Sequence, residues 1–220
     1  MVGAHATIAA PVAGSLLIFT ALRFEADALN KALRPDGQTL RIHVIGPSAQ
    51  NMPKNGDVAG CQGIIMAGLA GALDPALHDG EVVIDQPLGD TLQDTRWRPG
   101  GIHTSDRLVA TPAAKAALFA STGAAVVDME TAKARAFAER AGVPFLAIRA
   151  VSDRADQPLD PATVSWVTPA GGLRAGKVAA TLLRRPAMVP ELMRLRRRSN
   201  LAMRNLAEAI REILARSLFP

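Results

Sequence analysis

The sequence is poor in aromatic side chains and in cysteine: it has no tyrosine, two tryptophans, six phenylalanines and one cysteine among 220 residues. So few aromatic side chains argue against a surface on which the bases of single-stranded nucleic acid stack. The single Cys61 excludes an intramolecular disulfide and a cysteine-rich metal site, and we expect it to be a small buried hydrophobe. We therefore expect no nucleic-acid partner and a cytoplasmic location.

Motifs for metal binding and for serine hydrolases are also missing. The four histidines do not have the spacing H-E-x-x-H, so no metal site is expected, and there is no G-x-S-x-G elbow. The stretch GGLRAGKV at 171–178 matches G-x-x-x-x-G-K, but Val178 stands where a phosphate loop needs Ser or Thr for magnesium. No strand precedes it, and we interpret it as a chance match.

Long apolar runs free of interruption are absent, and the excess of positive over negative charge lies at one end. The apolar N-terminal run has no basic residue before Arg23, and Pro11 and Gly14 interrupt it, so neither a secretory signal nor a membrane span is expected. From Arg174 onward there are 11 Lys/Arg and 3 Asp/Glu, whereas the remainder has 14 and 17. The basic balance therefore belongs to a C-terminal tail, not to a basic face of the folded domain.

Short apolar runs alternate with helical patterns along the chain. Expected strands lie at 15–22, 40–46, 63–68, 81–86, 124–129 and 143–152, and expected helices lie at 24–33, 112–121, 131–142, 173–185 and 191–217. Strands that are apolar on both faces and separated by helices predict an α/β domain with a largely parallel or mixed sheet. We assign residues 1–185 to this domain and 186–220 to a basic C-terminal helical extension.

Polar side chains gather where two expected strands end. Asp128 and Glu130 follow one strand, and Ser152 and Asp153 end the next. In open α/β sheets, ligands bind outside the carboxyl ends of the strands. Arg149 lies inside the apolar run FLAIRAVSD, where its charge needs an acidic partner such as Glu130 or Asp128. From these residues alone, a ligand site and a structural ion pair with helix capping remain equally open.

A third acid, Glu25, follows the first strand in TALRFEADAL. Taken alone, it is an ordinary glutamate in the first turn of a helix.

The segment VVDMETAKARAFAERAGVPFLAIRAVSDRADQP resembles the nucleoside phosphorylase and nucleosidase superfamily, which includes purine nucleoside phosphorylases and methylthioadenosine/S-adenosylhomocysteine nucleosidases. TALRFEADAL and MAGLAGALDPALHDGEVVI also match, so the resemblance covers most of residues 15–160. IHTSDRLVATPAAKAALFASTGAAVVDME, together with the basic extension, is most similar to the hopanoid-associated phosphorylase branch. The implied fold is a three-layer α/β fold with a central mixed sheet flanked by helices.

The resemblance implies cleavage of the N-glycosidic bond of an adenine nucleoside, with release of adenine. By position, Asp153 would donate a proton to the purine N7 or hydrogen-bond to it, and an acid that acts in this way near neutral pH must hold its proton there, which burial favours. Glu130 would bind the ribose hydroxyls, and Met129 would pack against the sugar. Ser152 would help to position Asp153 or the base, and Arg149 would orient the carboxylates.

Glu25 stands where nucleosidases carry the glutamate that activates water and many phosphorylases carry an arginine that binds phosphate. In the Gly-rich turn that contains Gly68, Met66 and Leu69 replace the arginine and serine with which phosphorylases bind phosphate. Both differences favour hydrolysis without a cofactor over phosphorolysis, for which phosphate would be the co-substrate. The arginines that could hold phosphate instead are Arg23, Arg96, Arg98 and Arg107.

Leu108 and Val109 stand where relatives stack an aromatic side chain on the base. Within the hopanoid-associated branch the implied substrate is adenosylhopane, whose large apolar 5′ group Phe24 and Leu69 would suit. Soluble nucleosides such as methylthioadenosine are the alternative substrates, and a non-catalytic nucleoside- or lipid-binding protein is the alternative of another class.

The resemblance also implies a homo-oligomer, in which a neighbouring subunit could complete the site. Two alternatives remain open for the basic C-terminal helix. It rests on an anionic membrane surface, which would make the protein peripheral to the membrane, or its apolar side packs on the domain.

Overall fold

The computed structural model describes residues 14–33, 40–85 and 97–216. Its central sheet contains β1 (Leu16–Thr20), β2 (Leu40–Val44), β3 (Gly63–Ala72), β4 (Val82–Ile84), β5 (Arg98–Pro99), β6 (Ile102–Thr104), β7 (Val126–Asp128) and β8 (Phe145–Asp153). The helices are α1 (Arg23–Ala32), α2 (Pro112–Thr122), α3 (Thr131–Ala141), α4 (Ala162–Ser165), α5 (Ala175–Arg184) and α6 (Val189–Ala215), with short 3-10 turns η1 (Pro47–Ala49), η2 (Asn55–Val58) and η4 (Pro186–Met188).

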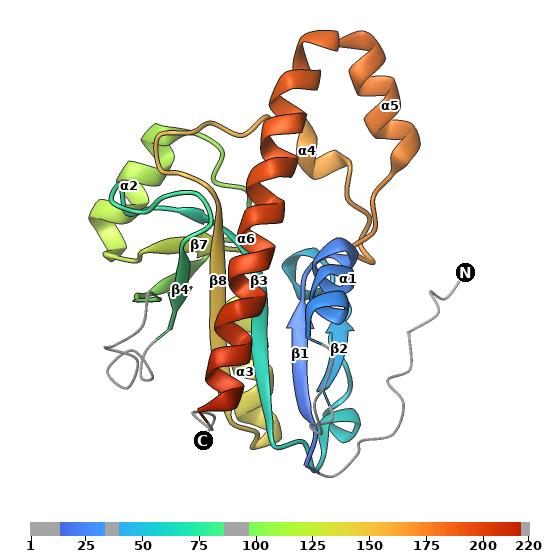
Figure 1. Cartoon of the computed structure of the whole chain (residues 1–220), viewed down its shortest axis with the longest axis vertical. Helices are drawn as coiled ribbons and strands as arrows, with labels where there is room; N and C mark the ends of the chain where they lie inside the picture. Colours follow the sequence, from blue (N-terminus) through green and yellow to red (C-terminus); the bar gives the residue numbers. More distant parts are fainter. Residues whose placement is uncertain (1–13, 34–39, 86–96, 217–220) are drawn as a thin grey trace.

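The sheet is mixed, and its strand order is β2-β1-β3-β8-β4-β5. Strands β2, β1, β3 and β8 are parallel, whereas β4 runs antiparallel to β8. Strand β7 pairs antiparallel with the end of β3, and β6 pairs with β7. Helices α1 and α6 cover one face of the sheet and α3 lies on the other (Figure 1). The predicted three-layer fold with a central mixed sheet is confirmed.

The central strands bury side chains on both faces. Ile18 packs into the core under α1 and α6, whereas its neighbour Leu17 packs into the core under α3, and both are fully buried. This alternation explains the continuous apolar runs, because a parallel strand covered by helices on both sides has no solvent face. Cys61, expected to be buried, is only partly buried at the edge of the α3 side of the core.

The two halves of α6 have different environments. In the second half, Ala202, Leu206, Ile210 and Ile213 are fully buried and belong to the core that α6 shares with α1 and the sheet. In the first half the side chains are exposed or half-buried, and this half projects beyond the sheet together with α5 (Figure 1). We call residues 173–198 the α5–α6 hairpin.

Replacing Leu206 with alanine removes a fully buried side chain from the core under α6. We expect a loss of about 2–5 kcal/mol in the free energy of unfolding, which urea denaturation measures. Leu183→Ala is the matched control, because Leu183 is 84% exposed and its truncation creates no cavity. Equal effects of the two substitutions would show that α6 does not pack on the sheet as described.

Candidate active site

The candidate site is built on the neighbouring strands β3 and β8, with the first turn of α1 and the β7–α3 junction beside them. Gly68 pairs with Arg149 and Gly71 pairs with Asp153 in the register of the two strands. A Cβ atom on Gly68 would lie 2.7 Å from Arg149 Nη1 and 2.9 Å from Glu25 Oε1, and one on Gly71 would lie 3.0 Å from Asp153 Oδ2. Gly68, before Leu69 in the strand, therefore makes room for Arg149 and Glu25, and Gly71, after Leu69, makes room for Asp153.

Glu25 is held by backbone donors in the first turn of α1. Its Oε2 accepts hydrogen bonds from the backbone N–H groups of Ala21 (3.1 Å) and Leu22 (2.9 Å), and its Oε1 accepts one from Leu69 (2.8 Å). Burial raises the pKa of the Glu25 carboxyl to about 7, although the Leu69 hydrogen bond and the Arg149 charge act in the opposite direction. A carboxyl with this pKa can hold or accept a proton near neutral pH.

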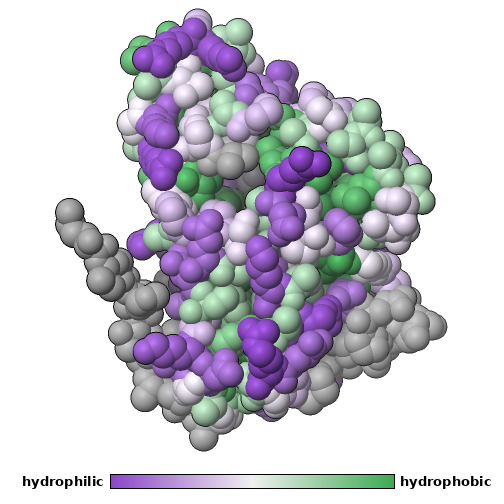
Figure 2. Space-filling model, turned by 180° about the vertical axis from the view of Figure 1, so that it is seen from behind, coloured by the Kyte–Doolittle hydropathy of each residue, from purple (hydrophilic) through white to green (hydrophobic). Residues whose placement is uncertain are grey.

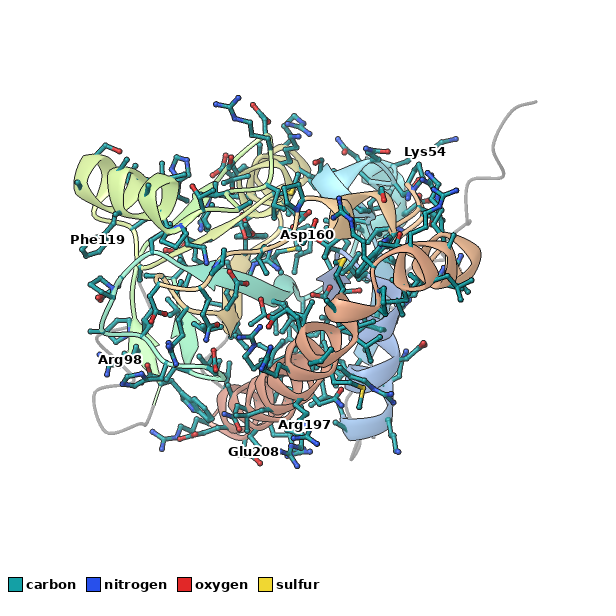
Figure 3. All side chains as sticks on the ribbon, turned by 90° about the horizontal axis from the view of Figure 1, so that it is seen from above. Lys54, Arg98, Phe119, Asp160, Arg197 and Glu208 are labelled. Carbon is teal, nitrogen blue, oxygen red and sulfur yellow. The ribbon has the colours of Figure 1, made fainter. Side chains whose placement is uncertain are left out.

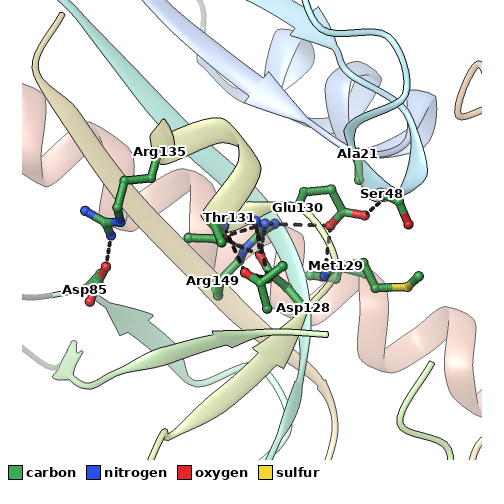
Figure 4. A network of polar contacts seen from close by, with 12 residues as sticks. Ala21, Ser48, Asp85, Asp128, Met129, Glu130, Thr131, Arg135 and Arg149 are labelled. Carbon is green, nitrogen blue, oxygen red and sulfur yellow. Dashed lines mark hydrogen bonds and ion pairs between the residues drawn. The ribbon is translucent and has the colours of Figure 1, made fainter. Parts of the chain in front are cut away.

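Arg149 extends from the middle of β8 and is 1% exposed (Figure 4). Its Nη2 forms an ion pair with Asp128, donates to Thr131 Oγ1 at 3.0 Å and lies 3.8 Å from Glu130 Oε2. The predicted acidic partners of Arg149 are confirmed, and both acids of the junction contribute. The buried charge is thus paired, as its place inside the sheet requires.

Asp128 and Glu130 have different environments. Asp128 accepts hydrogen bonds from Thr104 Oγ1 (2.8 Å) and from the backbone N–H of Thr131 (3.1 Å), the first residue of α3, whereas the N-cap position itself is Glu130. Glu130 Oε1 instead accepts a hydrogen bond from the backbone N–H of Ser48 at 2.9 Å. Burial raises the pKa of Glu130, and the Arg149 charge opposes this shift.

The backbone at Ser48 is in the left-handed region, with φ 55°, as is that of Ala49. Non-glycine residues rarely adopt this conformation, and where they do the surrounding structure must stabilise it. Here the conformation accompanies the hydrogen bond from Ser48 N–H to Glu130, which crosses from η1 to the β7–α3 junction (Figure 4). Met129, next to Glu130, is half-buried.

Asp153 ends β8 and is 2% exposed. Its Oδ1 lies 2.7 Å from Ser152 Oγ, which is also 3.3 Å from the carbonyl oxygen of Ala70. Its Oδ2 accepts a hydrogen bond from Lys115 Nζ at 2.5 Å. The expected contact of Ser152 with Asp153 is present, and Asp153 is buried, but an ammonium group that the sequence did not predict lies against its carboxylate.

Sequence reasoning missed Lys115. Its side chain is fully buried at the start of α2, and its Nζ donates to Asp153 and to the carbonyl oxygens of Arg154 (2.7 Å) and Gln157 (3.1 Å). All three donors of the ammonium group are therefore satisfied. The only signal in the sequence is a single lysine within the otherwise apolar helix PAAKAALFAS.

The remaining predicted contact residues lie around these groups. Leu69 is half-buried in β3, and its side chain packs against the core under α1 and α6. Leu108 and Val109 are half-buried in the segment before α2, where Val109 packs against Leu73 and Val127. The backbone N–H of Leu159 donates to Ala110 at 2.9 Å and joins this segment to the chain that follows Asp153.

The arginines considered for phosphate do not converge on the site. Arg23 Nε is exposed and 3.4 Å from the carbonyl oxygen of Ala170, and Arg107 is exposed before α2. Arg98 pairs with Glu81 and lies at the edge of the molecule (Figure 3). Arg96 lies outside the described residues. Within those residues, no group of three or more His, Cys, Asp or Glu side chains could hold a metal ion.

Comparison with known proteins agrees with this architecture. Residues 85–184 match the family model described as the Phosphorylase superfamily, a range that contains the β7–α3 junction and β8 but not Glu25. A search of curated proteins finds no match.

Solved structures of nucleosidases share the fold. The 5′-methylthioadenosine/S-adenosylhomocysteine nucleosidase of Helicobacter pylori aligns with a TM-score of 0.65 and 15% identity, over 94% of this chain and 100% of that one. The futalosine hydrolase of the same organism aligns with a TM-score of 0.64 and 14% identity, over 92% and 98%. The S-adenosylhomocysteine nucleosidase of Streptococcus pyogenes aligns with a TM-score of 0.55 and 22% identity, over 67% of this chain and 87% of that one. The fold is therefore nucleosidase-like.

Substituting Lys115 with methionine should leave Asp153 buried without its cation. Because breaking a buried ion pair is strongly destabilising, we expect a loss of about 3–5 kcal/mol in the free energy of unfolding. The loss in the double variant Lys115→Met/Asp153→Asn should be smaller than the sum of the two single losses, which a double-mutant cycle in urea measures. Lys133→Met, at a lysine that is 46% exposed, is the control, and additive effects would contradict the ion pair.

Proposed function

We propose that this protein hydrolyses the N-glycosidic bond of an adenine nucleoside and releases adenine. The observation that carries the proposal is Glu25, a buried carboxyl whose pKa is raised to about 7, beside Arg149 in a nucleosidase-like fold. A second carboxylate, Asp153, lies on the other side of Leu69 with its own cation. Two buried carboxyl groups so placed can supply the base and the acid that one hydrolysis needs.

In this mechanism Glu25 is the general base. Water attacks C1′ of the ribose as the bond from C1′ to the base nitrogen breaks, and Glu25 takes the proton that the water loses. A base is most effective when its pKa lies near the working pH, and burial places the Glu25 pKa there. The three backbone N–H groups around the carboxylate fix its position in the first turn of α1.

Asp153 acts on the leaving group. The electron pair of the broken bond goes to the purine, and a proton passed from Asp153 to N7 lets the base leave uncharged. Lys115 then stabilises the carboxylate that remains, through the hydrogen bond to Oδ2. Ser152 Oγ, 2.7 Å from Oδ1, holds the other oxygen in place. Without a ligand Asp153 is paired with the Lys115 ammonium group, so the proton that it passes to N7 has to come from solvent water as the nucleoside binds.

Glu130 and Met129 form the proposed ribose site. Carboxylates are strong acceptors for paired hydroxyl groups, and Glu130 is fixed by Ser48 N–H and by the Arg149 charge. We assign contact with the base to Leu108 and Val109, because a backbone hydrogen bond joins their segment to the chain after Asp153.

Hydrolysis is favoured over phosphorolysis by the charges around Glu25. A phosphate beside Glu25 would also meet Glu130, and the nearby cation, Arg149, is already paired with Asp128. Like charges at such distances disfavour binding of a phosphate dianion.

For the substrate, we propose a nucleoside with a large apolar 5′ group, of which adenosylhopane is the example implied by the sequence resemblance. Phe24 and Leu69 are both half-buried at the edge of the core under α1 and α6. We assign them to the 5′ group because Phe24 precedes Glu25 in the chain and the backbone N–H of Leu69 donates to Glu25. Methylthioadenosine is the soluble alternative.

Adenine release from adenosine, methylthioadenosine and a lipid-linked adenosine, each with and without phosphate, tests this function. We expect release without phosphate, and Asp153→Asn should lower kcat by about 10²–10⁴-fold, because general acid catalysis is worth this much. Ser105→Ala, at a side chain that bonds only within its own turn, is the control. A requirement for phosphate would contradict hydrolysis, and no release from any substrate would favour a binding protein.

The pH profile tests Glu25 separately. A general base must be deprotonated, so the profile of kcat/KM against pH should have a rising limb through about 7, the raised pKa of Glu25. Glu25→Gln should remove this rising limb together with most of the activity. Asp27→Asn, an exposed acid on the same helix, should leave both unchanged. A profile with the same rising limb in Glu25→Gln would assign the base to another group.

A further inference from the structure

The α5–α6 hairpin carries the large hydrophobic side chains that face solvent. In the described part of the chain, four such side chains are mostly or substantially exposed: Leu173 (64%), Leu183 (84%), Val189 (43%) and Met193 (47%). All four lie within residues 173–198. None of the residues of α5 is fully buried, and Leu183 near its end is left exposed by the described part of the chain.

The same hairpin is strongly basic. Residues 173–198 contain eight Lys/Arg and one Asp/Glu. Arg185, Arg194 and Arg198 pair with acids. Lys177, Arg184, Arg196 and Arg197 make no ion pair with any described residue. Hydrophilic side chains cover the hairpin in the space-filling view beside hydrophobic ones (Figure 2), and Arg197 points outward (Figure 3).

Apolar and cationic side chains lie close together on both helices. On α6, Val189, Met193 and Arg197 are spaced by four residues and therefore lie on one side of the helix. On α5, Leu183 is followed at once by Arg184, which is also exposed. Apolar groups flanked by unpaired cations are the pattern of helices that lie in the interface of an anionic membrane.

We propose that the α5–α6 hairpin docks on the surface of an anionic lipid bilayer. Leu183, Val189 and Met193 enter the interface, and the arginines beside them bind lipid phosphates. Charge decides for lipid over a second copy of the chain, because two hairpins of the same positive charge repel each other, whereas an anionic surface attracts them. No helix in the described ranges is long and apolar enough to cross a membrane.

The base of the hairpin lies next to the candidate active site. The carbonyl oxygen of Gly171 accepts a hydrogen bond from the backbone N–H of Arg23 at 2.9 Å, and that of Pro169 accepts one from Asn51 Nδ2 at 2.7 Å. Gly171 has φ 73°, and a Cβ there would lie 2.6 Å from the carbonyl oxygen of Ala21, so only glycine allows this close approach. The docked bilayer would thus lie at the end of the sheet that carries Glu25. Delivery of a lipid-linked substrate from the bilayer to this site rests on the proposed function.

Co-sedimentation with vesicles tests the docking without any substrate. The full chain should bind vesicles of phosphatidylcholine with phosphatidylserine and not vesicles of phosphatidylcholine alone, and binding should weaken as salt is raised. The variant Arg184→Glu/Arg196→Glu/Arg197→Glu should bind anionic vesicles about 100-fold more weakly. Lys31→Glu/Lys54→Glu/Arg140→Glu is the matched control, because it changes the net charge equally at exposed residues outside the hairpin.

A second variant, Leu183→Asp/Val189→Asp/Met193→Asp, should also lose binding while its thermal unfolding stays unchanged, since these side chains are exposed. Equal losses in the hairpin and control variants, or equal binding to neutral and anionic vesicles, would overturn the proposal. The proposal would also be overturned if the full chain did not bind vesicles and were a dimer that the aspartate variant converts to a monomer. A second copy of the chain would then cover the hairpin. Adenine release from a soluble nucleoside, measured in parallel, reports on the proposed function independently.

Discussion

The guanidinium group of Arg149 lies inside the central sheet, where a charge is stable only beside an acid. This requirement explains the arrangement around it: β7 ends in Asp128, α3 begins just after Glu130, and Gly68 leaves space in β3 for the arginine side chain. Because replacing a buried ion pair with apolar side chains is often neutral or stabilising, such a pair is weak support for a purely structural role. Its position beside Glu25 is what gives it a functional interpretation.

A second buried cation organises the other half of the site. Lys115 joins α2 to the end of β8 through Asp153, and it also fixes the turn after the strand through two carbonyl oxygens. The two ion pairs lie on either side of Leu69 in β3, so one strand sets the spacing between the proposed base and the proposed acid. Reactions that need two such groups depend on this spacing being rigid, and strands provide it better than loops.

Much of the fold could be predicted from the sequence, because strands buried on both faces read as continuous apolar runs. Strands β5 and β6 were missed because they are short and their side chains are exposed or half-buried. The acids around Arg149 could be predicted, since a charge in an apolar run demands a partner. Lys115 could not, because its partner is 38 residues away and a lysine on a helix normally faces solvent. The sequence of the C-terminal helix likewise did not show that the apolar residues of its second half pack in the core while those of its first half lie in the exposed hairpin.

The central claim is that the two buried ion pairs enclose one nucleoside site. A crystal structure of the protein with a non-hydrolysable adenosine analogue tests it most directly. The account predicts the purine N7 within hydrogen-bonding distance of Asp153, the ribose hydroxyls on Glu130 and a water molecule between Glu25 and C1′. An analogue bound away from these three carboxylates, or one whose base and sugar contact only one of the two pairs, would contradict it.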